Sequence, residues 1–104
     1  MSFLPFRPEF EAAIRSGTKT ATSRTRRYGE PGDILDTPFG PVRLLRVFKA
    51  SLSAVSEGLY REEGFTSPAE FMEAWTRIHP RKGFVPWQEV WVHEFSQLHG
   101  EEES

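Results

Sequence analysis

Apolar side chains recur at helical spacing near the beginning of the chain. Pro8 suits the first turn of a helix, Phe10, Ala13 and Ile14 follow at i, i+3 and i+4, and Gly17 stands where a helix commonly ends. The pattern predicts a short first helix that ends at Gly17.

The clearest helix signal lies in the second half of the chain. The segment Ser67–Glu70 is a capping box with proline at the first helical position, and Phe71, Trp75 and Ile78 follow at i, i+4 and i+7. Pro80 disfavours helical geometry in the residue before it, so this helix is expected to end near residue 79.

A third helix is predicted between these two segments. Ser53 can cap it, Val55 and Leu59 supply its apolar face, and Gly64 ends it. This assignment places the glutamates at 62 and 63 in the last turn, where carboxylates oppose the helix dipole. Such a position hints at a role other than stability.

Alternating apolar positions predict the strands. The segment Val42–Ala50 is the best of them, and Glu89–Phe95 reads as a closing strand because it is rich in β-branched and aromatic residues. On a regular strand Val42, Leu44 and Phe48 face one side, and Leu45 and Val47 face the other. Ile34–Leu35 predicts a short strand after a Pro-Gly-Asp turn. The Thr- and Ser-rich residues 18–25 suit either a strand or an ordered loop.

These elements predict an α+β fold: a small, mostly antiparallel sheet or barrel flanked by three short helices. No repeat or Gly/Pro/Ser-rich linker divides the 104 residues, so we expect one domain with a core over about 3–98 and an acidic tail at 99–104. The chain has no cysteine, which excludes disulfides and thiolate metal sites. Charged residues interrupt the first fifteen positions and no apolar run reaches membrane-spanning length, so a soluble, cytoplasmic protein is expected.

Charge is divided unevenly along the chain. The net charge is -2. Residues 1–50 carry nine basic and five acidic side chains, whereas residues 51–104 carry four basic and ten acidic side chains. Five cations without an acid lie within residues 15–27: Arg15, Lys19, Arg24, Arg26 and Arg27. Such a cluster attracts phosphate locally. The alternative is a solvated loop whose arginines pair with the acidic half.

The segment Gly17–Arg24 unites this cluster with hydroxyl groups. Its glycine, the lysine two positions on and the arginine five further resemble the G-x-K-x-x-x-x-R signature of the ASCH domain, a relative of the PUA fold found in RNA-modifying and RNA-binding proteins. The segments FRPEFEAAI, PGDIL and EEGFTSPAEF follow the family's order, so the resemblance runs from about Phe3 to Phe95. It implies a PUA-like barrel.

Some bacterial members of that family are amidohydrolases that remove acetyl from N4-acetylcytidine with a lysine, a threonine and a glutamate. By motif, the resemblance places these roles on Lys19 as base, Thr22 as nucleophile and Glu63 as proton carrier for the leaving amine. Residues that the resemblance and the charge cluster place at a nucleoside or RNA are Gly17, Lys19, Thr20, Arg24, Arg26 and Arg27. No cofactor or metal is implied.

Two physical conditions follow for such a site. Lys19 and Thr22 point to opposite faces of a regular strand, so they share a site only if residues 19–22 leave that geometry. A lysine base also needs its pKa lowered from about 10.4 toward 7 or 8. Burial and Arg24 would lower that pKa, whereas an ionised Glu63 would raise it.

Several candidate residues have simpler explanations. Glu63 can serve as a salt-bridge partner of Arg24, and Thr20 can be a mere strand former. His79 and His93 stand 14 apart without a third ligand at matching spacing, which argues against a metal site. Trp87 lies in a polar stretch and can either join the core or stack on a base.

Three hypotheses remain for the function. The first is a protein that binds RNA or a modified pyrimidine nucleoside in a basic cleft. The second is an N4-acetylcytidine-type amidohydrolase. The third is a protein-interaction domain whose acidic half docks a basic partner. The sequence leaves the oligomeric state open.

Overall fold

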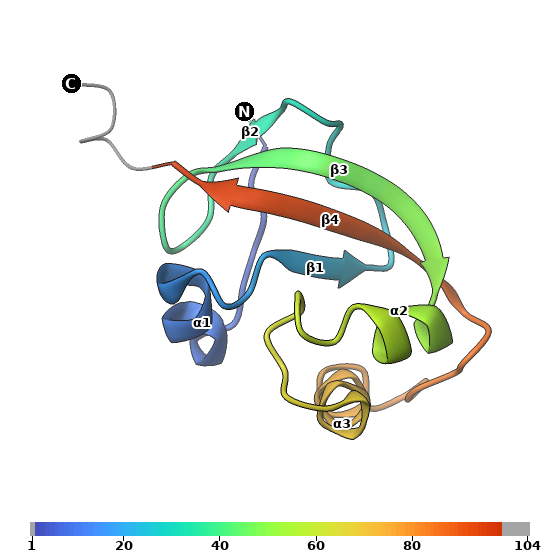
Figure 1. The fold of residues 1–104 in the computed structure, drawn as a ribbon. Coiled ribbons are helices and arrows are strands. Elements are labelled where there is room, and N and C mark those ends of the chain that lie inside the picture. The colour runs from blue at the N-terminus through green and yellow to red at the C-terminus, as the bar shows by residue number, and fades with distance from the viewer. Residues whose placement is uncertain (1, 99–104) are drawn as a thin grey trace.

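Four antiparallel strands form one curled sheet in the order β1-β4-β3-β2 (Figure 1). The computed structural model describes residues 2–98, so the predicted acidic tail at 99–104 lies outside the described residues. The elements in chain order are η1 (Pro8–Phe10), α1 (Glu11–Ser16), β1 (Ala21–Arg24), β2 (Ile34–Leu35), β3 (Val42–Ser51), α2 (Leu52–Gly58), α3 (Pro68–Ile78) and β4 (Glu89–Gln97). The predicted α+β class, with a half-barrel sheet and three α-helices, is confirmed.

The helix ends explain how local sequence sets the elements. Gly17 adopts φ 83° at the C-cap of α1, a left-handed conformation that glycine tolerates best. At α3, the Ser67 hydroxyl accepts a hydrogen bond from the Glu70 backbone N–H, and Glu70 Oε1 accepts one from the N–H of Thr66. The predicted ends of both helices and the predicted start of α3 are therefore confirmed, whereas the first helix begins with the 3-10 turn η1 and becomes α-helical only at Glu11.

The predicted helix over 53–64 is shorter and begins earlier. β3 continues to Ser51, whose hydroxyl caps α2, and the helix ends at Gly58. The glutamates at 62 and 63 lie beyond the end of α2. The prediction that their carboxylates oppose the dipole of this helix was therefore wrong. The Glu62 carbonyl accepts hydrogen bonds from the backbone N–H groups of Thr20 and Ala21, at 2.8 and 2.9 Å. This pairing holds the segment after α2 against the chain that enters β1.

The predicted faces of β3 were also wrong beyond Leu44. The register of β3 against β4 shifts between Leu44 and Arg46, which leaves Leu45 exposed as a bulge. An extra residue reverses the alternation that follows it. Val47 therefore packs on the same side as Leu44, and Phe48 packs on the opposite side.

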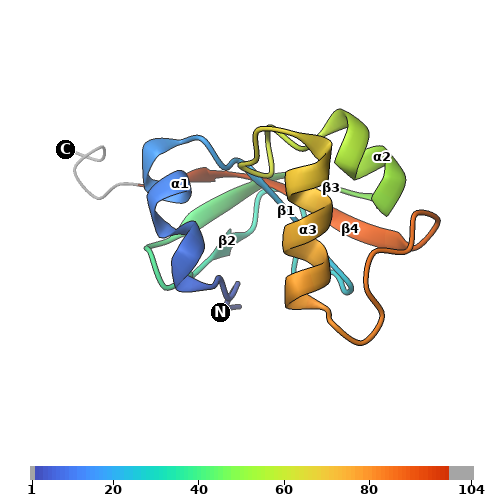
Figure 2. The ribbon, with the colours of Figure 1, turned by 90° about the horizontal axis from the view of Figure 1, so that it is seen from below.

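The core consists of two hydrophobic clusters. Figure 2, the view from below, shows α1 and α3 at different ends of the sheet. The cluster under α2 and α3 contains Ala21, Leu52, Val55, Phe71, Trp75, Val90 and Val92. The cluster beside α1 contains Leu4, Ile14, Leu35, Val42, Leu44 and Phe95. Within residues 2–98, no helix has the length and apolar character needed to span a membrane.

The N-terminal segment is fixed next to β2. Phe3 forms an isolated parallel bridge with Asp36, and the Leu4 backbone N–H donates to the Asp36 carbonyl at 2.8 Å. This anchor leads residues 5–10 across the edge of β1.

Candidate functional site

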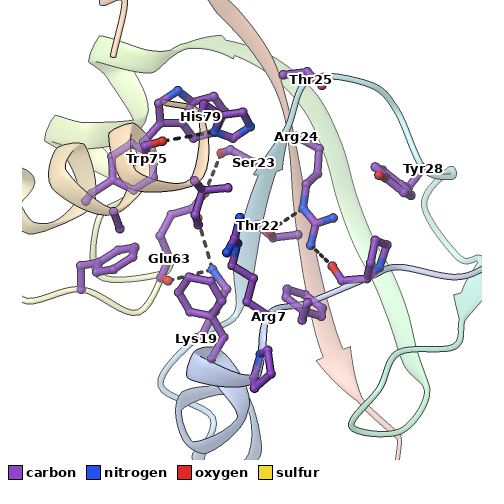
Figure 3. Close-up of a pocket in the computed structure, with 18 residues that line it drawn as sticks. Arg7, Lys19, Thr22, Ser23, Arg24, Thr25, Tyr28, Glu63, Trp75 and His79 are labelled. Atoms are coloured by element: carbon purple, nitrogen blue, oxygen red, sulfur yellow. Dashed lines mark hydrogen bonds and ion pairs between the residues drawn. The ribbon is translucent and has the colours of Figure 1, made fainter. Parts of the chain in front are cut away.

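A cleft of about 570 Å³ lies along β1, the edge strand of the sheet (Figure 3). Its walls come from the N-terminal segment over 5–10, from residues 22–28, from the turn that contains Glu63 and Phe65, and from α3 between Phe71 and His79. The cleft thus joins segments that are far apart in sequence but are brought together by the sheet edge.

Lys19 and Glu63 form a buried ion pair in this cleft. Each residue is only 3% exposed, and Lys19 Nζ lies 3.3 Å from Glu63 Oε1. The same ammonium donates to the backbone carbonyls of Ala21 at 3.0 Å and Glu63 at 2.8 Å. Three acceptors match the three N–H groups of a charged lysine, so Lys19 rests as an ammonium in this arrangement.

Burial acts against that charge. Desolvation lowers the pKa of Lys19 below its ordinary value, while the Glu63 carboxylate opposes the shift and Arg24 adds to it. The ammonium also lies 4.9 Å from the centre of the Phe10 ring, whose face attracts a cation. Because a buried ion pair is weak evidence for stability, this pair marks a candidate functional site.

The Ser23 hydroxyl completes the contacts of Glu63. It donates to Glu63 Oε2 at 2.6 Å, so that each carboxylate oxygen has one side-chain donor. Sequence reasoning did not single out Ser23 as a site residue, although it lies inside the hydroxyl-rich segment. Glu63 pairs with Lys19 and Ser23 here, and no ion pair to Arg24 occurs within residues 2–98.

Thr22 is held by the arginine of the signature. Arg24 Nε donates to Thr22 Oγ1 at 3.0 Å, and its Nη2 donates to the Pro5 carbonyl. The guanidinium carbon of Arg24 lies 4.9 Å from the Phe6 ring centre and 5.3 Å from that of Tyr28. These contacts fix Arg24 between the N-terminal segment and β1, with its charge at the cleft.

The geometric condition on Lys19 and Thr22 is met because Lys19 precedes the strand. β1 begins at Ala21, so strand alternation does not separate the two side chains, and both line the cleft. No hydrogen bond joins Lys19 to Thr22 in the part of the chain that the structure describes.

His93 lies behind Thr22 and is completely buried. Its Nε2 accepts from the Tyr28 backbone N–H at 3.0 Å, and its Nδ1 lies 3.4 Å from the Thr22 carbonyl. An Nδ1–H tautomer satisfies both contacts. Burial lowers the pKa of His93, and Arg24 and Arg27 add to this shift, so its imidazole is neutral at pH 7.

Aromatic rings form the wall opposite the polar groups. Phe65 packs edge-on against Phe10 and Phe71, and the His79 ring stacks on Trp75 with centroids 4.1 Å apart. His79, expected only to punctuate the helix end, lines the cleft instead. The chain thus presents flat apolar surfaces next to a cluster of ammonium, hydroxyl and carboxylate groups.

The remaining predicted site residues lie outside this cleft. Gly17 caps α1 and Thr20 precedes β1, and neither lines it. Arg26 lines a neighbouring pocket, and Arg27 lies over the Trp91 ring, 5.3 Å from its centre. Trp87 is 79% exposed, so it belongs neither to the core nor to the cleft.

Comparison with known proteins gives structural likeness without sequence matches. Neither a curated protein nor a protein-family profile matches the chain. The solved ASCH domain of Lactobacillus crispatus JV V101 is similar with a TM-score of 0.69 and 16% identity, over 92% of this chain and 76% of that one. An ASCH protein of Zymomonas mobilis, solved as a point mutant, has a TM-score of 0.64 and 19% sequence identity, and the match covers 92% of this chain and 68% of that one. A protein of Pyrococcus furiosus has a TM-score of 0.65 and 20% sequence identity, and the match covers 95% of this chain and 99% of that one.

Proposed function

We propose that this chain, which has the fold of the ASCH domains that the segment Gly17–Arg24 resembles, binds a modified pyrimidine nucleoside, free or within RNA, in the cleft along β1. The observation that carries the proposal is the buried pair of Lys19 and Glu63 next to the hydroxyls of Thr22 and Ser23. A desolvated ion pair of this kind is more typical of a site than of a core.

The shape and chemistry of the cleft support this ligand class. A volume of about 570 Å³ suits a small molecule of nucleoside size. The rings of Phe10, Phe65 and Trp75 offer apolar faces for a base, and the polar end offers donors and acceptors for its exocyclic groups. Arg24 stands where a phosphate or sugar hydroxyl can reach its free N–H groups.

Calorimetric titration tests binding directly. We expect saturable binding of cytidine or N4-acetylcytidine, and weaker binding of adenosine. Lys19→Met should reduce the affinity at least tenfold, because it leaves the Glu63 carboxylate in the cleft without its charged partner. Lys49→Met is the matched control, since Lys49 lies on β3 with an exposed side chain that reaches Glu89. No saturable binding by any nucleoside would refute the proposal.

A second candidate function is hydrolysis of the exocyclic amide of an N4-acylated cytidine. The convergence of Lys19, Thr22 and Glu63 on one cleft favours it. The resting charges are those of an ammonium and a carboxylate, so a proton would first pass from Lys19 Nζ to Glu63 across their 3.3 Å contact. The burial of the pair makes this transfer less costly, because two neutral groups are easier to keep away from water than two charges.

The reaction can then proceed in two halves. Thr22 Oγ1 attacks the acyl carbon and gives its proton to the neutral Lys19 amine. The C–N bond breaks as Glu63 protonates the leaving amine, which releases cytidine and leaves an acyl ester on Thr22. The regenerated Glu63 carboxylate then deprotonates a water molecule, which attacks the ester. As the acid is released, the Lys19 ammonium returns its proton to Thr22 Oγ1, which restores the hydroxyl and leaves the pair neutral, as it was before the attack.

Chromatography of cytidine released from N4-acetylcytidine tests this activity. Thr22→Ala should lower kcat at least a hundredfold, because it removes the nucleophile. Thr18→Ala is the control, since Thr18 is exposed and, among residues 2–98, its side chain forms a hydrogen bond with that of Ser16 alone. Equal rates in these two variants would refute the assigned role of Thr22, while binding could persist.

A further inference from the structure

A second pocket of about 400 Å³ adjoins the cleft. It is lined by Ser2, Phe3, Pro5, Arg26 and Tyr28. Pro5 and Tyr28 also line the cleft, so the two hollows share a wall. A ligand that leaves the cleft past Tyr28 therefore enters this second pocket.

Arg26 supplies the charge of this pocket. Its side chain is exposed, and its guanidinium carbon lies 4.0 Å from the centre of the Tyr28 ring, which orients the planar group. Within residues 2–98, no carboxylate forms an ion pair with it. A stacked arginine without an acidic partner keeps its N–H groups available to an anion.

Phe3 supplies an apolar face. Its side chain is 52% exposed although its backbone is fixed by the bridge to Asp36. An exposed aromatic ring on an anchored backbone loses little conformational freedom when a flat group stacks on it. Proteins that bind single-stranded nucleic acids commonly combine an aromatic ring, on which a base stacks, with a basic side chain that contacts the phosphate.

We infer that the second pocket is a subsite for the nucleotide that adjoins the nucleoside in the cleft, with Arg26 at the connecting phosphate and Phe3 against the neighbouring base. The inference rests on the proposed function, since it requires a nucleoside in the cleft. It deepens that function by making a single-stranded RNA, rather than a free nucleoside, the preferred ligand.

Calorimetric titration with cytidine, cytidine monophosphate and cytidine-containing dinucleotides separates the contributions. We expect the monophosphate to bind more tightly than cytidine, and the better dinucleotide to bind at least tenfold more tightly than cytidine. Arg26→Gln should abolish most of the affinity that the phosphate adds. Phe3→Ala should abolish the further affinity that the second base adds. Both variants should bind cytidine as the unaltered protein does, which also shows that they fold.

Two matched variants control for unspecific attraction of the ligand to exposed positive charge and to exposed aromatic rings. Arg27→Gln removes another exposed arginine, which lies over Trp91. Trp87→Ala removes an aromatic ring that is 79% exposed and lines neither pocket. Neither variant should change the ratio of the affinity for the dinucleotide to that for cytidine.

The outcomes distinguish the two proposals. If cytidine binds but the dinucleotides bind no more tightly, the second-pocket inference is overturned and the proposed function stands. Equal losses in the Arg26 and Arg27 variants overturn it as well, because they indicate unspecific attraction. A gain from the monophosphate without any from the second base overturns the role of Phe3. Failure of every ligand to bind refutes the proposed function itself.

Discussion

Lys19 Nζ lies 3.3 Å from Glu63 Oε1, with 3% and 4% of the two side-chain surfaces exposed. The two residues are 44 positions apart, and the turn after α2 brings the carboxylate to the start of β1. This contact organises the cleft, because Ser23 bonds to the second oxygen of Glu63 and Phe10 covers the ammonium.

Lys19 and Glu63 should contribute to stability as a coupled pair. Lys19→Met leaves a buried carboxylate with one donor, and we expect it to lower the free energy of unfolding by about 3–5 kcal/mol. Glu63→Gln should cost less, because burial already lowers the pKa of Lys19 and favours release of its proton. In urea unfolding, the double variant should lose less than the sum of the single losses. Strictly additive losses would contradict a coupled pair.

Ser23→Ala should destabilise the protein by removing the donor to Glu63 Oε2. A hydrogen bond to a buried charged group contributes about 1.5–3 kcal/mol, and we expect a loss in that range. Ser56→Ala is the control, since Ser56 is also buried but donates to a neutral carbonyl, that of Ser53, at 3.0 Å. Its loss should be near 1 kcal/mol. Equal losses in urea unfolding would show that the charge of Glu63 adds nothing.

Gly64→Ala should disturb the site through the backbone. Gly64 has φ 98°, and an added Cβ would lie 3.1 Å from Lys19 Cβ. Gly17 has φ 83° with open space around the same position. Gly17→Ala should therefore cost about 1–2 kcal/mol for the left-handed conformation alone, and Gly64→Ala should cost about 1–3 kcal/mol more for the close contact. Thermal unfolding of the two variants compares them, and equal losses would contradict the contact.

His93 should make stability depend on pH below neutrality. Its folded pKa lies below the unfolded value of about 6.5 because of burial. Between these two values the unfolded chain binds the proton and the folded protein does not, so stability falls as the pH drops through this window. The slope contributed by one such group is at most about 1.4 kcal/mol per pH unit. His93→Gln should flatten urea-unfolding stability between pH 7 and 5 relative to the unaltered protein, and an unchanged decline would contradict this assignment.

Local signals in the sequence were sufficient for most elements and for the centre of the site. The capping box at Ser67 and the glycine at 17 determine helix ends by bonds among near neighbours. The motif that resembles the ASCH signature led to Lys19, Thr22 and Arg24, and all three line the cleft. Glu63 was identified through the same resemblance, with no local pattern to place it opposite Lys19.

Features that depend on long-range contacts could not be predicted. The bulge at Leu45 follows from pairing with β4, and α2 ends early because the chain after it bonds to the residues that enter β1. The arginines at 24, 26 and 27 look equivalent in sequence, yet of these three only Arg24 lines the cleft, while Arg26 lines the second pocket and Arg27 lies over Trp91. Ser23 could have been suspected from its place between Thr22 and Arg24.

The bridge between Phe3 and Asp36 has a practical consequence for experiments. It holds the start of the described chain against β2, and Ser2 itself lines the second pocket. A purification tag fused ahead of Ser2 would emerge beside Arg26 and compete for the same space as a ligand. Recombinant protein for titrations should therefore carry its tag at the other terminus, or have it cleaved off before measurement.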